Sequence, residues 1–140
     1  MRLVLDTDTI VAGLRSPRGA SAALLRAIRR GRATMLLSTA LLLEHEAVCQ
    51  REEHRIAAGL TRAEVETFLD GLAVLAKPVA VHFLWRPQLR DAGDEMVLET
   101  AVNGQAQAIV AFNHRDYGTA PTRFGIALLL PAEALRRIEG

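Results

Sequence analysis

The sequence contains little cysteine and little lysine, and it has no long hydrophobic run. Cys49 is its only cysteine, which excludes an internal disulfide framework. No apolar stretch approaches the ~20 residues that a membrane-spanning helix needs. The segment Arg2–Leu5 looks like a strand and lacks the pattern of a signal peptide. We therefore expect a cytoplasmic protein with no membrane partner.

The basic side chains are nearly all arginine, because Lys77 is the only lysine among 17 basic residues. Arginine suits bidentate contacts with phosphate, but a GC-rich genome produces the same bias. The formal net charge of +1 neither indicates nor excludes nucleic acid. Charge alone therefore leaves the ligand class open.

Length and hydropathy fit one globular domain, residues 1–140. Half of the residues are apolar and 24% are charged, which is ordinary for an α/β protein and unlike a disordered chain. We find no internal repeat, low-complexity tract or linker. The chain therefore has enough apolar residues for one sizeable core.

Strand and helix patterns alternate along the chain. The expected strands are Arg2–Asp6, Thr34–Leu37, Val79–Phe83, Ala108–Phe112 and Ile126–Leu130. The expected helices are Thr9–Leu14, Ala20–Arg30, Ser38 or Thr39 to about Glu53, Thr61 to about Ala76, Asp94–Asn103 and a short one from Pro131. Continuously apolar strands are typical of a parallel sheet covered on both faces. We predict a three-layer α/β/α sandwich of Rossmann-like type, with its ligand site beyond the carboxyl ends of the strands.

Polar and acidic residues follow these strands. Asp6 ends the first strand and Asp8 follows two residues later, while Asn113 and Asp116 follow the fourth strand. Asp94 begins the helix that precedes the fourth strand. Because the carboxyl ends of parallel strands share one edge of the sheet, these side chains are expected to meet there.

Glu44 joins this group through its place on a helix. Leu41 and Val48, at i−3 and i+4, are apolar and put Glu44 on the inward face. Val97 and Leu98 do the same for Asp94. Buried carboxylates are costly and repel one another, and a divalent cation such as Mg²⁺ or Mn²⁺ relieves both effects. Such a cation can polarise a phosphodiester and activate water, so we predict metal-dependent phosphodiester hydrolysis.

Each acid also has a simpler interpretation. Asp6 and Asp94 are residue types that commonly cap helices. Glu44 could pair with an arginine, and Asp116 could be only a turn residue before Tyr117. Their joint placement at one sheet edge favours a shared site.

Four segments of the chain, in order, resemble the motifs of the PIN-domain family. They are Leu3–Asp8, Ser38–Glu44, Arg90–Glu99 and Ala108–Tyr117. The resemblance runs from end to end and is greatest to the branch described as toxin components of toxin–antitoxin pairs. The chain differs at Asp8, where the family usually has Asn, at Ala92-Gly93, which replaces a Pro-Asp pair, and at Ala111, which replaces a common Thr.

The resemblance implies an RNA endonuclease that depends on Mg²⁺ or Mn²⁺. It implies that the catalytic and metal-binding acids are Asp6, Glu44, Asp94 and Asp116. The supporting residues would be Thr7, Asp8, Glu95 and Asn113. Thr7 and Asn113 would act through hydrogen bonds, Asp8 would bind metal or repel Asp6, and Glu95 could substitute for Asp94. The branch also implies a homodimer and an antitoxin that covers the active-site groove.

Two other function classes stay open. One is a PIN module that has lost catalysis and binds RNA or protein, which the changes at Asp8 and Gly93 would favour. The other is a haloacid-dehalogenase-like phosphatase, which also begins with two aspartates after an apolar strand. That class needs a positioned lysine and a later paired-acid motif, whereas Lys77 stands before Pro78 and no such motif follows the fourth strand.

Several other polar and aromatic residues carry weaker expectations. The four histidines, His45, His54, His82 and His114, show no metal-ligand spacing. Trp85 could stack on a base, although packing in the core or an interface is the default expectation. We expect an RNA groove to be lined by some of Arg15, Arg18, Arg86, Arg90 and Arg115.

Overall fold

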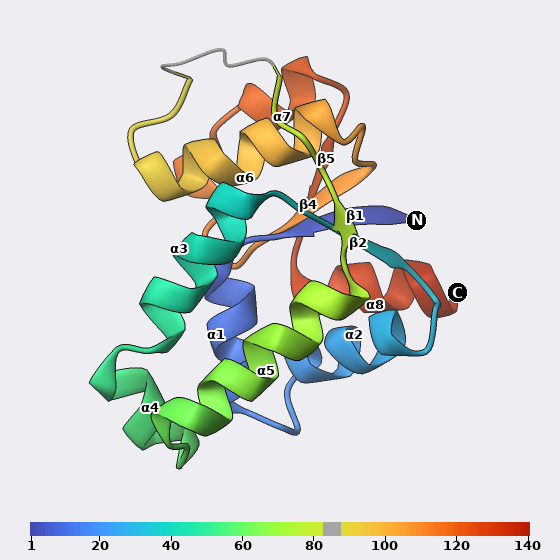
Figure 1. Cartoon of the computed structure of the whole chain (residues 1–140). Helices are drawn as coiled ribbons and strands as arrows, with labels where there is room; N and C mark the ends of the chain where they lie inside the picture. Colours follow the sequence, from blue (N-terminus) through green and yellow to red (C-terminus); the bar gives the residue numbers. More distant parts are fainter. Residues whose placement is uncertain (83–87) are drawn as a thin grey trace.

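The computed structural model describes residues 1–82 and 88–140. Its centre is a five-stranded, all-parallel sheet with strand order β3-β2-β1-β4-β5. The strands are β1 (Arg2–Leu5), β2 (Thr34–Leu37), β3 (Lys77–Pro78), β4 (Ala108–Val110) and β5 (Ala127–Leu129). The helices are α1 (Thr7–Arg15), α2 (Ala20–Arg29), α3 (Thr39–Cys49), α4 (Glu52–Ala58), α5 (Arg62–Leu75), α6 (Ala92–Asn103), α7 (Ala120–Arg123) and α8 (Pro131–Glu139), with a 3-10 turn η1 (Arg115–Tyr117). Helices cover both faces of the sheet (Figure 1), so the predicted three-layer α/β/α fold is confirmed.

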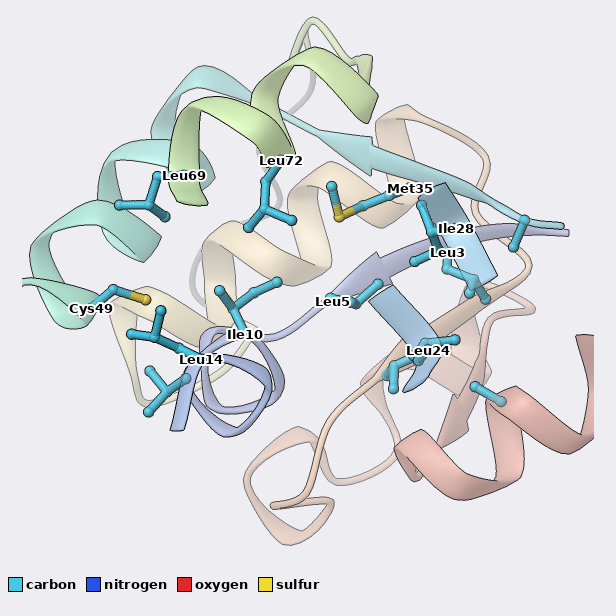
Figure 2. Close-up of a cluster of buried hydrophobic side chains, with 14 of the residues drawn as sticks. Leu3, Leu5, Ile10, Leu14, Leu24, Ile28, Met35, Cys49, Leu69 and Leu72 are labelled. Carbon is cyan, nitrogen blue, oxygen red and sulfur yellow. The ribbon is translucent and has the colours of Figure 1, made fainter. Parts of the chain in front are cut away.

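The alternation of side chains along β1 explains the two cores. Leu3 and Leu5 point to one face and join the cluster shown in Figure 2, which α1, α2, α5 and α8 cover. Val4 points to the other face and joins a second cluster under α6 and α7. All three side chains are buried. A strand with both faces buried must be apolar at every position, which is why the continuous apolar pattern predicted the architecture.

Helix caps follow the sequence signals closely. The Ser38 hydroxyl accepts a hydrogen bond from the Leu41 amide at 3.2 Å and caps α3. Thr61 and Glu64 form a reciprocal capping box at the start of α5. Pro131 is the first residue of α8. These three helix starts were therefore predicted correctly.

The helix expected from Ser38 to about Glu53 is wrong in its second half. It ends at Cys49, and α4 is a separate helix. Arg51 lies between them in an extended conformation, with φ −60° and ψ 137°, which interrupts the helical hydrogen bonds. No glycine or proline marks this break, so the sequence pattern gave no signal for it.

The third strand also differs from its predicted bounds. The expected strand Val79–Phe83 is replaced by β3, which pairs Lys77 and Pro78 with the end of β2. The Val79 amide adds one more hydrogen bond, to the carbonyl of Leu37 at 2.9 Å. Residues 80–82 are not in a strand, and Phe83 lies outside the described residues. The described part of the apolar run is therefore one partly buried valine, Val79, followed by the exposed residues 80–82.

Within the described ranges, no helix has both the length and the apolar character needed to cross a bilayer.

Candidate active site

The candidate site lies at the edge of the sheet where β1 and β2 end and where α1, α3 and α6 begin (Figure 1). Both strand-to-helix connections there are one residue long, Asp6 after β1 and Ser38 after β2. The first turns of α1 and α3 are therefore fixed against the sheet. α3 also packs along α6, which brings the acids of three helices toward one edge.

Asp6 is both a helix cap and a member of the acidic cluster. Its Oδ1 accepts the Asp8 amide at 3.0 Å, which caps α1. Its Oδ2 accepts the Tyr117 hydroxyl at 2.5 Å. The side chain is only 8% exposed, and burial, with the nearby charges of Asp8 and Asp91, raises the pKa of Asp6. Its capping role and a functional role are therefore compatible.

Asp91 is an acid of this site that the sequence analysis missed. It is the N-cap of α6, and its Oδ1 accepts the amides of Gly93 at 2.7 Å and Asp94 at 3.2 Å. The prediction that Asp94 begins this helix is therefore wrong, since α6 begins at Ala92. Asp91 and Asp94 stand at N-cap and N3 spacing, a signal that could have located the helix start.

Asp94 carries the clearest electrostatic signature of the site. Its side chain is partly buried in the first turn of α6. Burial, followed by the charges of Asp6, Asp91 and other acids, raises the pKa of Asp94 to about 7. The remaining contributors are Asp116 and Asp8. The raised pKa of Asp94 thus indicates that carboxylates from several elements lie close enough to repel its negative charge.

Glu44, on α3, lies beside the start of α6. A methyl group placed on Gly93 would be 3.4 Å from Glu44 Oε1 and 3.0 Å from Asp91 Oδ1. Gly93, which replaces an acid of the family motif, therefore lies where α3 and the start of α6 approach each other closely. Within residues 1–82 and 88–140, Glu44 forms no ion pair, so the arginine partner considered for it is not found there.

Asp116 lies in η1, directly before Tyr117 in the sequence. Its Oδ2 accepts a hydrogen bond from Asn113 Nδ2 at 2.8 Å, and both residues are exposed. Thr7, by contrast, contacts a histidine rather than an acid. Its hydroxyl is 2.8 Å from Nδ1 of His45, whose pKa burial lowers to about 4.

The two remaining predicted residues bind backbone amides. Glu95 is buried, and its Oε1 accepts the amides of Gln88 at 2.6 Å and Leu89 at 2.7 Å. Asp8 accepts amides of the loop that follows β4. Both carboxylates therefore hold loops that border the site.

A cavity of about 690 Å³ opens beside these acids. Its described lining includes the acids Asp91, Asp94 and Asp116, the residue Tyr117, and the arginines Arg90, Arg115 and Arg123. Arg123 was not predicted because it lies on α7, a helix that the sequence analysis did not identify. The cavity thus combines an acidic wall with basic side chains.

Two other predicted arginines, Arg15 and Arg18, do not line this cavity. Arg15 ends α1, and its Nη1 lies 3.3 Å from Nδ1 of His54. Arg18 is exposed in the turn between α1 and α2. Arg86 and Trp85 lie outside the described residues.

The sequence that forms this arrangement matches a known protein family. Residues 2–115 match the PIN domain family. The chain belongs to the PIN-domain family. PIN domains are generally nucleases, and they generally use divalent metal ions. The match includes Asp6, Glu44 and Asp94 and ends one residue before Asp116. No curated protein shows significant similarity to the chain.

The donor set of this PIN domain fits the metal chemistry of the family. Among the described residues, no three His, Cys, Asp or Glu side chains converge at ligating distances. Mg²⁺, however, typically takes only one or two carboxylates and keeps several waters. The site offers carboxylate oxygens, which Mg²⁺ and Mn²⁺ prefer, and the raised pKa of Asp94 shows negative charge that a cation would stabilise. Oxygen donors and excess charge therefore both suit a hard divalent cation.

Proposed function

We propose that this PIN domain is an RNA endonuclease that depends on Mg²⁺ or Mn²⁺. The main support is one observation: Asp94 lies at an edge of the sheet where burial, followed by the charges of Asp6, Asp91, Asp116 and Asp8, raises its pKa to about 7. In the described part of the chain none of these acids forms a salt bridge. Negative charge that the protein leaves unpaired attracts a divalent cation, and a bound cation would in turn attract the negatively charged phosphodiester.

The residues divide into three roles in this proposal. Asp6, Glu44 and Asp94 would hold the cation, with Asp116 as the fourth acid beside the cavity. The cation would polarise the phosphodiester and lower the pKa of attacking water. The Tyr117 hydroxyl fixes one oxygen of Asp6, leaving fewer orientations for that carboxylate. The basic side chains of the cavity, Arg90, Arg115 and Arg123, would contact RNA phosphates.

We extend the proposal to a biological role as the toxin of a toxin–antitoxin pair. The support is the resemblance of four successive motifs to that branch of the family. In this role the protein would form a homodimer, and an antitoxin would cover the acidic groove. A short gene for a small DNA-binding protein directly upstream would support this extension.

Cleavage of RNA tests the proposal. Wild-type protein in Mn²⁺ or Mg²⁺ is expected to cut RNA and to lose this activity in EDTA. Asp6→Asn and Asp94→Asn are expected to reduce cleavage about 100-fold or more. The matched control is Asp70→Asn, an exposed aspartate on α5, which is expected to cut like wild type.

The same assay separates the other function classes. RNA that is bound but not cut in Mn²⁺ would indicate a PIN module without catalysis. Hydrolysis of a phosphomonoester without RNA cleavage would indicate a phosphatase. Lys77 is exposed on the edge strand β3 and is not part of the cavity lining, which does not favour the phosphatase.

A further inference from the structure

We propose that Phe112 is a stacking surface for an unpaired base of the RNA, and that Asp8 fixes the backbone that presents it. This inference rests on the proposed ribonuclease function and deepens it by assigning a base-binding position beside the acidic cluster. It also gives Asp8, which departs from the usual Asn of the family, a role other than binding metal.

Asp8 holds the loop after β4 by several hydrogen bonds. Its Oδ2 accepts the amides of Phe112 at 3.1 Å and Asn113 at 3.2 Å. Its Oδ1 accepts the Thr9 hydroxyl at 3.1 Å and lies 3.3 Å from the Phe112 amide nitrogen. Hydrogen bonds to a charged carboxylate are stronger than neutral ones. Asp8 is in the first turn of α1, two residues from Asp6, so the backbone of Phe112 is fixed close to the acidic cluster.

The chain is also fixed on the other side of Phe112. The amide of Ala111 donates to the carbonyl of Leu129 at 3.0 Å, which continues the pairing of β4 with β5. Ala111 itself is buried in the core. With both neighbouring positions held, the backbone that carries the Phe112 ring is fixed at this edge of the sheet.

The exposure of this ring distinguishes it from the other described aromatic side chains. Phe112 is 49% exposed. Tyr117 is buried, and Phe68 and Phe124 pack against the two cores. In the described ranges, Phe112 is thus the one aromatic side chain in the exposed class. An exposed aromatic ring on a fixed backbone, beside the proposed phosphodiester-binding site, can bind a ligand that has an apolar face.

An unpaired nucleobase has the chemistry that this position requires. A phenyl ring offers no charge for phosphate, but every base presents a π-face that stacks on it. Bases within a duplex are already paired and stacked, so an aromatic side chain reaches unpaired ones. The arginines that would contact phosphate lie at the cavity, which leaves base contact to Phe112.

The test uses a short unpaired RNA that contains the fluorescent base 2-aminopurine. Phe112→Ala is expected to raise KM about tenfold, to change kcat less than about twofold, and to abolish quenching of the base on binding in EDTA. Phe112→Trp is expected to retain both properties. Ile56→Ala is the matched control, because Ile56 is 71% exposed on α4, away from the site. Thermal unfolding confirms that each variant folds. The stacking proposal is overturned if Phe112→Ala behaves like Ile56→Ala.

Variants of Asp8 test how the ring is held. Asp8→Asn keeps one acceptor oxygen and is expected to leave KM within about threefold of wild type. Asp8→Ala frees the loop and is expected to match Phe112→Ala, and the double variant is expected to be no worse than either single one. If Asp8→Asn is as damaging as Asp8→Ala, Asp8 acts through its charge and the clamp is overturned.

The outcomes also separate this proposal from the function on which it rests. Wild-type protein that neither cuts nor binds any RNA would contradict both. Wild-type protein that cuts RNA, with Phe112→Ala unchanged in KM and quenching, would contradict stacking alone. Protein that binds without cutting would still decide the stacking proposal, because quenching is measured in EDTA.

Discussion

At the scale of single residues, Asp94 links the electrostatics of the site to stability. Its pKa of about 7 in the folded protein lies above the ordinary value near 4 of an unfolded chain. The ionised carboxylate therefore destabilises the fold at and above pH 7, and this penalty is lost as the pH falls from about 7 toward 4. His45 acts in the opposite direction below about pH 6.5, because its folded pKa is lowered to about 4. Between pH 8 and pH 6.5, the change in stability with pH is thus dominated by the acids rather than by His45.

Asp94→Asn is predicted to stabilise the metal-free protein in a pH-dependent way. In EDTA at pH 8 the free energy of unfolding should rise by about 1 kcal/mol, once solvent screening is allowed for. The gain should shrink as the pH falls toward 6.5, since the wild-type carboxyl then becomes protonated. Urea unfolding at both pH values measures this, with Asp70→Asn as the control. A gain that is equal at both pH values would contradict the assigned pKa shift.

The residues also differ in how far the sequence could predict them. Strand ends and helix faces were enough to select Asp6, Glu44 and Asp94. Asp91 required the correct start of α6, which the glycine at position 93 obscured. The Tyr117–Asp6 hydrogen bond joins residues 111 positions apart, and no local pattern signals such a contact. Local chemistry is therefore enough to select candidate acids, while the contacts that hold them depend on tertiary structure.

At the scale of secondary-structure elements, the cap of α3 connects folding to the site. The Ser38 hydroxyl caps α3 and lies 2.8 Å from the Thr100 hydroxyl of α6. It therefore ties together the helix that carries Glu44 and the helix that carries Asp94. The capping box of Thr61, by contrast, is exposed at the start of α5. The Ser38 and Thr61 caps are chemically similar, but only the Ser38 cap lies at the candidate active site.

Replacing these two caps should separate stability from activity. Ser38→Ala and Thr61→Ala are each predicted to lower the free energy of unfolding by about 1–2 kcal/mol. Only Ser38→Ala is predicted to reduce RNA cleavage, because it loosens the packing of α3 on α6. Urea unfolding and initial rates at a temperature where both variants are folded provide the measurement. Equal effects on activity would argue against this role for Ser38.

Element boundaries were predicted best where polar signals mark them. Thr34–Leu37 agrees fully with β2, and Pro131 opens α8 as expected. The break between α3 and α4 has no glycine or proline. The apolar residues Val79 and Val81 are also poor markers, because β3 instead contains Lys77 and Pro78. Hydrophobic pattern alone cannot separate a short edge strand from the exposed chain that follows it.

At the scale of the whole molecule, basic residues are placed unequally around the fold. Arg90, Arg115 and Arg123 border the cavity beside the acids. Arg137, in contrast, is exposed on α8, which packs on α2 at the opposite face of the sheet. A net charge of +1 gives no strong overall attraction to RNA. Binding should therefore depend on the position of the arginines rather than on their number.

Removing a cavity arginine is predicted to weaken RNA binding in a salt-dependent way. Arg90→Ala, Arg115→Ala or Arg123→Ala should each reduce affinity about threefold to tenfold and lower the salt slope by about one. Arg137→Ala should leave both quantities near those of wild type. Fluorescence anisotropy between low and moderate salt measures this. If Arg137→Ala weakens binding as much as the cavity variants, the cavity is not the RNA-binding surface.

Titration of Mn²⁺ by calorimetry tests the central claim most directly, namely that these acids together hold a divalent cation. At pH 7, in two buffers of different ionisation enthalpy, wild-type protein is predicted to bind Mn²⁺ and to release about half a proton, which Asp94 supplies because its pKa is about 7. Asp6→Asn and Asp94→Asn are predicted to bind at least about tenfold more weakly, and Asp70→Asn to bind like wild type. Folded wild-type protein that binds no Mn²⁺, or an Asp94→Asn variant that binds it equally tightly, would contradict the account.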